Sequence, residues 1–121
     1  MKKIFVLLFG LLAAGQVFAQ AAGNTCTAAA TSADGAIITV IGVGTPSFVV
    51  VPFTPKCSAN TFVSFEQNAV AFVVGSASSK GKNAFLGSSG GGGVSGQKCA
   101  GVTCIQTDAT SRLAAALALA T

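Results

Sequence analysis

Two stretches of the chain alternate between apolar and polar side chains, as half-buried β-strands do. Residues 61–66 and 69–74 flank Gln67 and Asn68, a two-residue connection in which asparagine tolerates a positive φ. The alternation therefore predicts an antiparallel hairpin that turns at these two residues. This register makes one side of the hairpin apolar, through the facing pairs Phe65 with Val70, Val63 with Phe72 and Thr61 with Val74.

β-Branched residues dominate two further stretches, 36–43 and 47–51, which a Gly-Thr-Pro segment separates. This composition predicts a second hairpin. Pro52 and Pro55 are expected to end its second strand, because proline cannot donate a hydrogen bond to a β-ladder.

A helical pattern begins at Asp108. Leu113 and Leu117 lie four positions apart among alanines, so they share one helix face, and aspartate is a favoured N-cap residue. We therefore expect a C-terminal helix at about 108–120. A short alanine-rich helix is marginal alone and needs a surface on which to dock.

The other segments lack a clear period. Residues 20–35 are expected to form an irregular N-terminal arm and 75–83 a polar loop, with a short strand at 84–86. The glycine and serine run at 87–96 is expected to be flexible. The predicted fold class is α+β, with all-β as the alternative: one small domain at 36–121, in which the helix packs on an antiparallel β-sheet of four or five strands.

The first 19 residues have the organisation of a cleavable secretory signal peptide. Lys2 and Lys3 give a basic start, residues 4–14 form an apolar run, and Ala19 is a small residue at the expected cleavage site. The run is shorter than the roughly 20 residues that a membrane-spanning helix needs. We therefore expect a periplasmic or extracellular protein without a stable membrane anchor after cleavage.

Export changes the interpretation of the four cysteines, Cys26, Cys57, Cys99 and Cys104. An even number of cysteines in a small exported protein predicts disulfides. Three pairings are open, and Cys26–Cys57 with Cys99–Cys104 is preferred, because the short Ala-Gly segment after Cys99 can close on itself. Zinc is the rival interpretation, but the chain has one close cysteine pair and no histidine. No metal site is expected.

Charge narrows the range of partners. Removal of the leader leaves five of the seven basic residues against three acidic ones, spread along the chain, which does not favour nucleic-acid binding. Charged residues make up 8% of the chain, against about a quarter in typical soluble domains. A surface with so few charges favours contact with other envelope or extracellular proteins, or with copies of the same chain.

The sequence gives little support for enzyme activity. Without histidine, a general base near neutral pH would have to be a carboxylate or a lysine, and the serines have no base in sequence to activate them. The Lys80–Asn83 turn departs from a phosphate-binding loop, because five residues separate Gly75 from Gly81 and Asn83 replaces the hydroxyl residue. We expect no enzyme activity and no cofactor, and regard Lys80, Lys82 and Asn83 as a partner-contact loop.

These observations favour a non-enzymatic structural or accessory component of a cell-envelope or extracellular assembly, such as a surface filament or a secretion or conjugation apparatus. A small binding module of the inhibitor or immunity type is the alternative. A secreted antibacterial protein ranks third, because the basic residues do not gather on one helix face.

Overall fold

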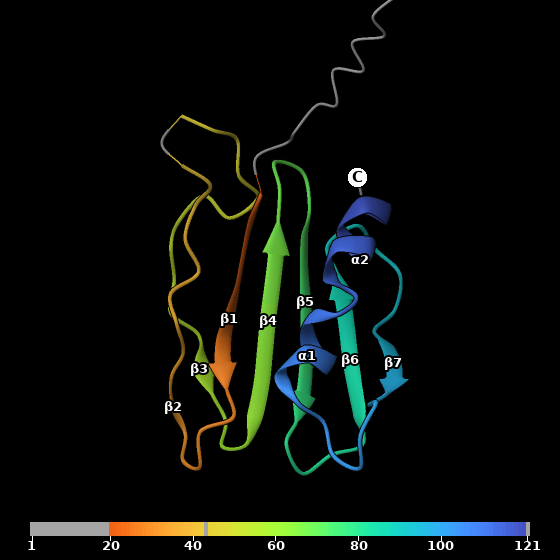
Figure 1. Ribbon diagram of the computed structural model, residues 1–121. Coiled ribbons are helices and arrows are strands. Elements are labelled where there is room, and N and C mark those ends of the chain that lie inside the picture. Colours follow the sequence, from red (N-terminus) through yellow and green to blue (C-terminus); the bar gives the residue numbers. More distant parts are fainter. Residues whose placement is uncertain (1–19, 43, 121) are drawn as a thin grey trace, which may run out of the picture.

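The computed structural model describes residues 20–42 and 44–120, so the expected signal peptide at 1–19 lies outside the described residues. The main feature is a five-stranded antiparallel sheet in the order β1-β4-β5-β6-β7 (Figure 1). Its strands are β1 (Ala21–Thr27), β4 (Thr61–Gln67), β5 (Phe72–Ser78), β6 (Asn83–Ser88) and β7 (Ser95–Lys98). Two short strands, β2 (Ala33–Asp34) and β3 (Lys56–Cys57), pair separately beside it. This is a disulfide-stabilised α+β fold.

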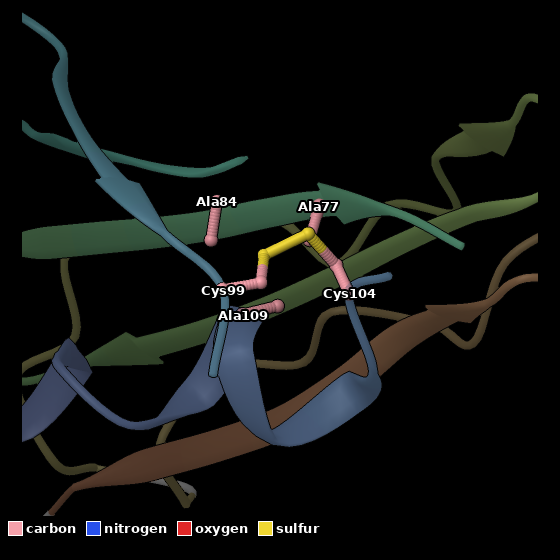
Figure 2. Close-up of a cluster of buried hydrophobic side chains, with 5 residues drawn as sticks. All are labelled: Ala77, Ala84, Cys99, Cys104 and Ala109. Atoms are coloured by element: carbon pink, nitrogen blue, oxygen red, sulfur yellow. A yellow bond between two sulfur atoms is a disulfide. The ribbon is translucent and has the colours of Figure 1, made fainter. Parts of the chain in front are cut away.

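Two short helices, α1 (Gln106–Thr110) and α2 (Leu113–Leu119), cover one face of the sheet over its central strands. Small residues let them approach closely. A Cβ atom at Gly75 would fall on the carbonyl oxygen of Ala109, well inside contact distance. The core between the layers comprises Ala77, Ala84, Cys99, Cys104 and Ala109 (Figure 2), followed by Ala71, Val73, Leu113 and Leu117.

The C-terminal helix differs from the prediction in two ways. It begins at Gln106, so Asp108 lies in the first turn and is not the N-cap residue. There its carboxylate accepts the N–H groups of Ile105, at 2.8 Å, and Ala100, at 3.1 Å. The helix is also interrupted between Thr110 and Leu113, where α2 starts. The buried stripe of Leu113 and Leu117 is as predicted.

The hairpin of β4 and β5 exists, but its register was predicted wrongly. Phe65 faces Val74 instead of Val70, because the connection spans four residues and not two. Asn68 closes this connection, and its side-chain oxygen accepts the N–H groups of Val70 and Ala71 at 2.9 Å. The shift of four is even, so side chains that lie in both the predicted and the observed strands keep their predicted face, whereas Val70 lies in the connection and is 63% exposed.

The second predicted hairpin, at 36–51, does not form a ladder among its described residues, 36–42 and 44–51. The chain does double back there, but pairing is limited to an isolated bridge between Ile38 and Phe53 and to β2 with β3. Proline at 46, 52 and 55 removes ladder donors, and Gly42 and Gly44 adopt positive φ angles of 51° and 79°. Irregular backbone therefore replaces the expected strands.

Several segments expected to be irregular are strands, and residues 75–78 of the predicted polar loop belong to β5. Residues 21–27 of the predicted N-terminal arm form β1, which pairs with β4 along its length with one bulge after Asn24. The glycine and serine run contributes the start of β7, and β6 extends beyond the predicted 84–86. These additions take their hydrogen bonds from a neighbouring strand, which local composition does not reveal.

Candidate functional site

The segment between β2 and β3 exposes several large apolar side chains. Residues 35–55, which we call the apolar loop, contain no charged side chain. Their inner residues Ile38 and Ile41 are buried, but Val50 is 78% exposed, Val51 70% and Phe53 47%. Large apolar side chains that lie together in water mark interaction surfaces. The apolar loop is therefore one candidate site.

Gln67, at the end of β4, holds the apolar loop against the sheet face opposite the helices. Its side chain is fully buried. The amide donates to the carbonyl oxygen of Thr39 at 2.7 Å and accepts the N–H of Val49 at 2.9 Å. Phe48 stacks on Phe72 of β5 with ring centroids 6.3 Å apart. The loop is thus attached at both of its limbs, and its exposed residues are held in place.

The sequence did not reveal the role of Gln67. It was predicted to lie in a two-residue turn, where a polar side chain is ordinarily solvated. The sequence contained only a weak indication of this role. A long uncharged loop that crosses a sheet has backbone N–H and C=O groups that need hydrogen-bond partners, and a glutamine side chain offers both a donor and an acceptor.

The predicted contact residues Lys80, Lys82 and Asn83 lie at the end of the sheet away from the β4–β5 turn. Lys80 and Lys82 flank the turn between β5 and β6, and Asn83 is the first residue of β6. The register places Asn83 opposite Lys98 of β7. Lys98, which is distant in sequence from Lys80 and Lys82, therefore lies at the same end of the sheet, which the charge pattern alone had not indicated.

Lys82 stands between two depressions at this end. One, of about 320 Å³, opens on the sheet face opposite the helices; we call it the basic hollow. It is lined by Thr61, Ser76, Ser78, Lys82, Asn83 and Phe85, with Ala77 and Gly81. The other, of about 470 Å³, lies between Lys82, Lys98 and the loop at 99–102. A side chain at 82 can contact a molecule in either one.

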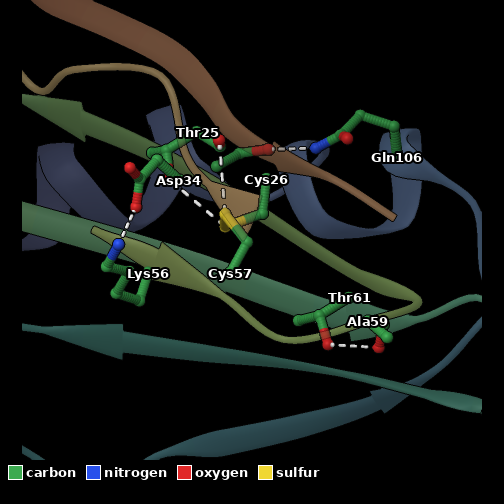
Figure 3. The surroundings of a disulfide bond; sticks show 9 residues. Thr25, Cys26, Asp34, Lys56, Cys57, Ala59, Thr61 and Gln106 are labelled. Atoms are coloured by element: carbon green, nitrogen blue, oxygen red, sulfur yellow. Dashed lines mark hydrogen bonds and ion pairs between the residues drawn. A yellow bond between two sulfur atoms is a disulfide. The ribbon is translucent and has the colours of Figure 1, made fainter. Parts of the chain in front are cut away.

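The two disulfides are Cys26–Cys57 and Cys99–Cys104, the pairing preferred from the sequence. The first joins β1 to β3 beside the ion pair of Lys56 with Asp34 (Figure 3). The second closes a short loop, and its two cysteines are buried between the helices and the sheet. Both positions are structural, since each ties an irregular segment to the sheet.

One cluster combines potential metal ligands. Among the described residues, the ligand atoms of Cys99, Cys104 and Asp108 lie within 4.8 Å of one another. The two sulfur atoms are bonded to each other, so they are not thiolates, the form that binds metal. Both carboxylate oxygens of Asp108 already accept backbone N–H groups. The cluster therefore serves to close the loop before α1.

In the described part of the chain, no helix is long and apolar enough to cross a membrane. The two disulfides are typical of a protein that matures in an oxidising, exported environment. No protein-family model, curated protein or solved structure shows significant similarity to the chain.

Proposed function

We propose that this protein is an exported, non-enzymatic component of a cell-envelope or extracellular assembly, and that it joins the assembly through its apolar loop. The observation that carries the proposal is the exposure of Val50, Val51 and Phe53 on an uncharged loop whose inner side is fixed to the sheet. A loop held in this way keeps its apolar side chains in water unless another protein covers them.

The remaining surface is consistent with this role. The chain carries few charges, so it has little electrostatic repulsion to keep copies apart. The carboxylates of Asp34 and Asp108 are engaged, the first with Lys56 and the second with backbone N–H groups. The partners are other envelope or extracellular proteins, including further copies of this chain.

Sedimentation of the purified, disulfide-bonded protein tests the proposal. Wild-type protein is expected to sediment as oligomers, and the V50S/V51S variant as a monomer with an unchanged melting temperature. V94S is the matched control, because Val94 is a similarly exposed apolar residue, at 72%, on the loop between β6 and β7. A wild-type protein that stays monomeric at high concentration would count against the proposal.

A second candidate function is a small binding module of the inhibitor or immunity type, which contacts its partner through Lys80, Lys82 and Asn83. The observation that favours it is the position of Lys82 between two depressions. Replacement of Lys80 and Lys82 by alanine should then abolish partner binding and leave the melting temperature unchanged.

A further inference from the structure

The basic hollow has an aromatic side chain on one wall and hydroxyl groups on its floor. Phe85 of β6 faces Ser76 on β5 and Gly96 on β7. A Cβ atom at Gly96 would lie 3.4 Å from the Phe85 ring, so the ring lies over this glycine. Phe85 remains 49% exposed. The hollow therefore offers a broad apolar face at the level of the sheet.

Polar groups surround this face. Thr61 and Ser78 are cross-strand partners at the end of the floor. Asn83 adds an amide at the rim. The hydroxyl of Ser76 makes no hydrogen bond to any other described residue, although it lines the hollow. A ligand with several hydroxyl groups would find both donors and acceptors here.

The charge at the rim is positive. Within residues 20–42 and 44–120, the ion pair is that of Lys56 with Asp34, which leaves Lys82 and Lys98 without a carboxylate partner. Lys82 lines the hollow, and Lys98 is the cross-strand neighbour of Asn83. Because no acidic side chain lines the hollow, its field favours an anionic ligand.

We infer that the basic hollow binds an acidic glycan, a chain of sugars that carry carboxylates. The C–H face of a sugar ring would pack on Phe85, its hydroxyls would bond to the floor and to Asn83, and its carboxylates would pair with Lys82 and Lys98. The inference uses Lys82 and Asn83, as the second candidate function does, but assigns them a glycan instead of a protein partner, and it does not depend on the apolar loop.

Two other anionic partners fit less well. An acidic peptide that adds as a strand needs a free sheet edge, whereas β5 and β6 are paired on both sides. A lipid surface is bound by apolar groups that project into it, whereas Phe85 lies over Gly96 beside a recess.

Calorimetric titration of the disulfide-bonded protein at low salt tests the inference with three probes of equal length. Tetragalacturonate presents sugar rings with carboxylates, maltotetraose presents neutral rings, and tetraglutamate presents carboxylates without rings. We expect tetragalacturonate to bind and the other two to bind at least about tenfold more weakly. Its affinity should fall as salt rises, because the lysines are at the surface.

Matched variants locate the site. K82A/K98A should weaken tetragalacturonate binding about tenfold and F85S about fivefold, with unchanged melting temperatures. The control K56A removes one lysine from another surface, and F53S removes a phenyl ring of similar exposure. Both should bind like wild type, as should V50S/V51S, which separates this inference from the role of the apolar loop.

Three results would overturn the inference: no binding of tetragalacturonate at millimolar concentration, equal binding of tetraglutamate, or wild-type affinity in F85S. Binding to anionic phospholipid vesicles that K82A/K98A abolishes, with no binding to tetragalacturonate, would identify a lipid surface instead.

Discussion

At the scale of single residues, the position of the apolar loop depends on Gln67. Its amide is the buried link between β4 and both limbs of the loop. The sequence predicted the strand that precedes Gln67 but placed Gln67 itself in the turn, because a glutamine beside an asparagine is typical of a solvated turn. Its burial depends on where the loop lies, and that is set by tertiary contacts.

Replacement of Gln67 by alanine should therefore destabilise the fold by about 2–3 kcal/mol, because the carbonyl of Thr39 and the N–H of Val49 lose their partners. Urea unfolding measures the change. Gln97 is an exposed glutamine on β7, and Q97A should change the free energy of unfolding by less than about 0.5 kcal/mol. Equal effects of the two substitutions would contradict this account of Gln67.

Gly75 sets the distance between sheet and helix. A methyl group there would collide with the backbone of Ala109, so G75A must push α1 off the sheet and should cost about 2 kcal/mol or more. In G93A the added methyl group meets no atom within 4 Å, and no loss is expected. Thermal unfolding of both variants checks the difference, and a G75A protein as stable as wild type would show that the contact is looser.

At the scale of elements, the periodicity of apolar residues correctly predicted which side chains share a face, wherever one face of the element is buried. The Leu113 and Leu117 stripe and the faces of the β4–β5 hairpin were predictable because burial imposes a period on sequence. The register was not, since it depends on how Asn68 closes a four-residue turn. β1 was missed because its small side chains carry little pattern, and β7 because it is short and contains no apolar side chain.

The two disulfides should differ in their contribution to stability. Cys26 and Cys57 are 31 residues apart and Cys99 and Cys104 are 5 apart, so the longer loop restricts the unfolded chain more. The chain-entropy model gives about 4 and about 2 kcal/mol. Denaturant unfolding of C26A/C57A and C99A/C104A, with the other disulfide kept, measures both. A larger loss from C99A/C104A would mean that packing of the buried sulfurs outweighs loop length.

At the scale of the whole molecule, the sequence predicted export, disulfides and contact with other proteins. It named Lys80, Lys82 and Asn83 as the contact loop and did not point to the apolar loop. The apolar loop was predicted as a hairpin, whose strands would have buried half of its side chains. Prolines and positive-φ glycines prevent that ladder and leave Val50, Val51 and Phe53 exposed. The grouping of Lys82 with Lys98 likewise depends on the β6–β7 register, which the glycine-rich segment between those strands does not encode.

Photo-crosslinking in intact cells that export the protein tests most directly whether another protein covers the apolar loop. A photoreactive residue at position 51 should give a discrete, larger adduct, whereas the same residue at position 94, similarly exposed on the loop between β6 and β7, should give little. Mass spectrometry of the adduct would then identify the covering protein, whether a second copy or another envelope component. A protein that stays uncrosslinked at position 51, or that crosslinks equally at position 94, would contradict the account.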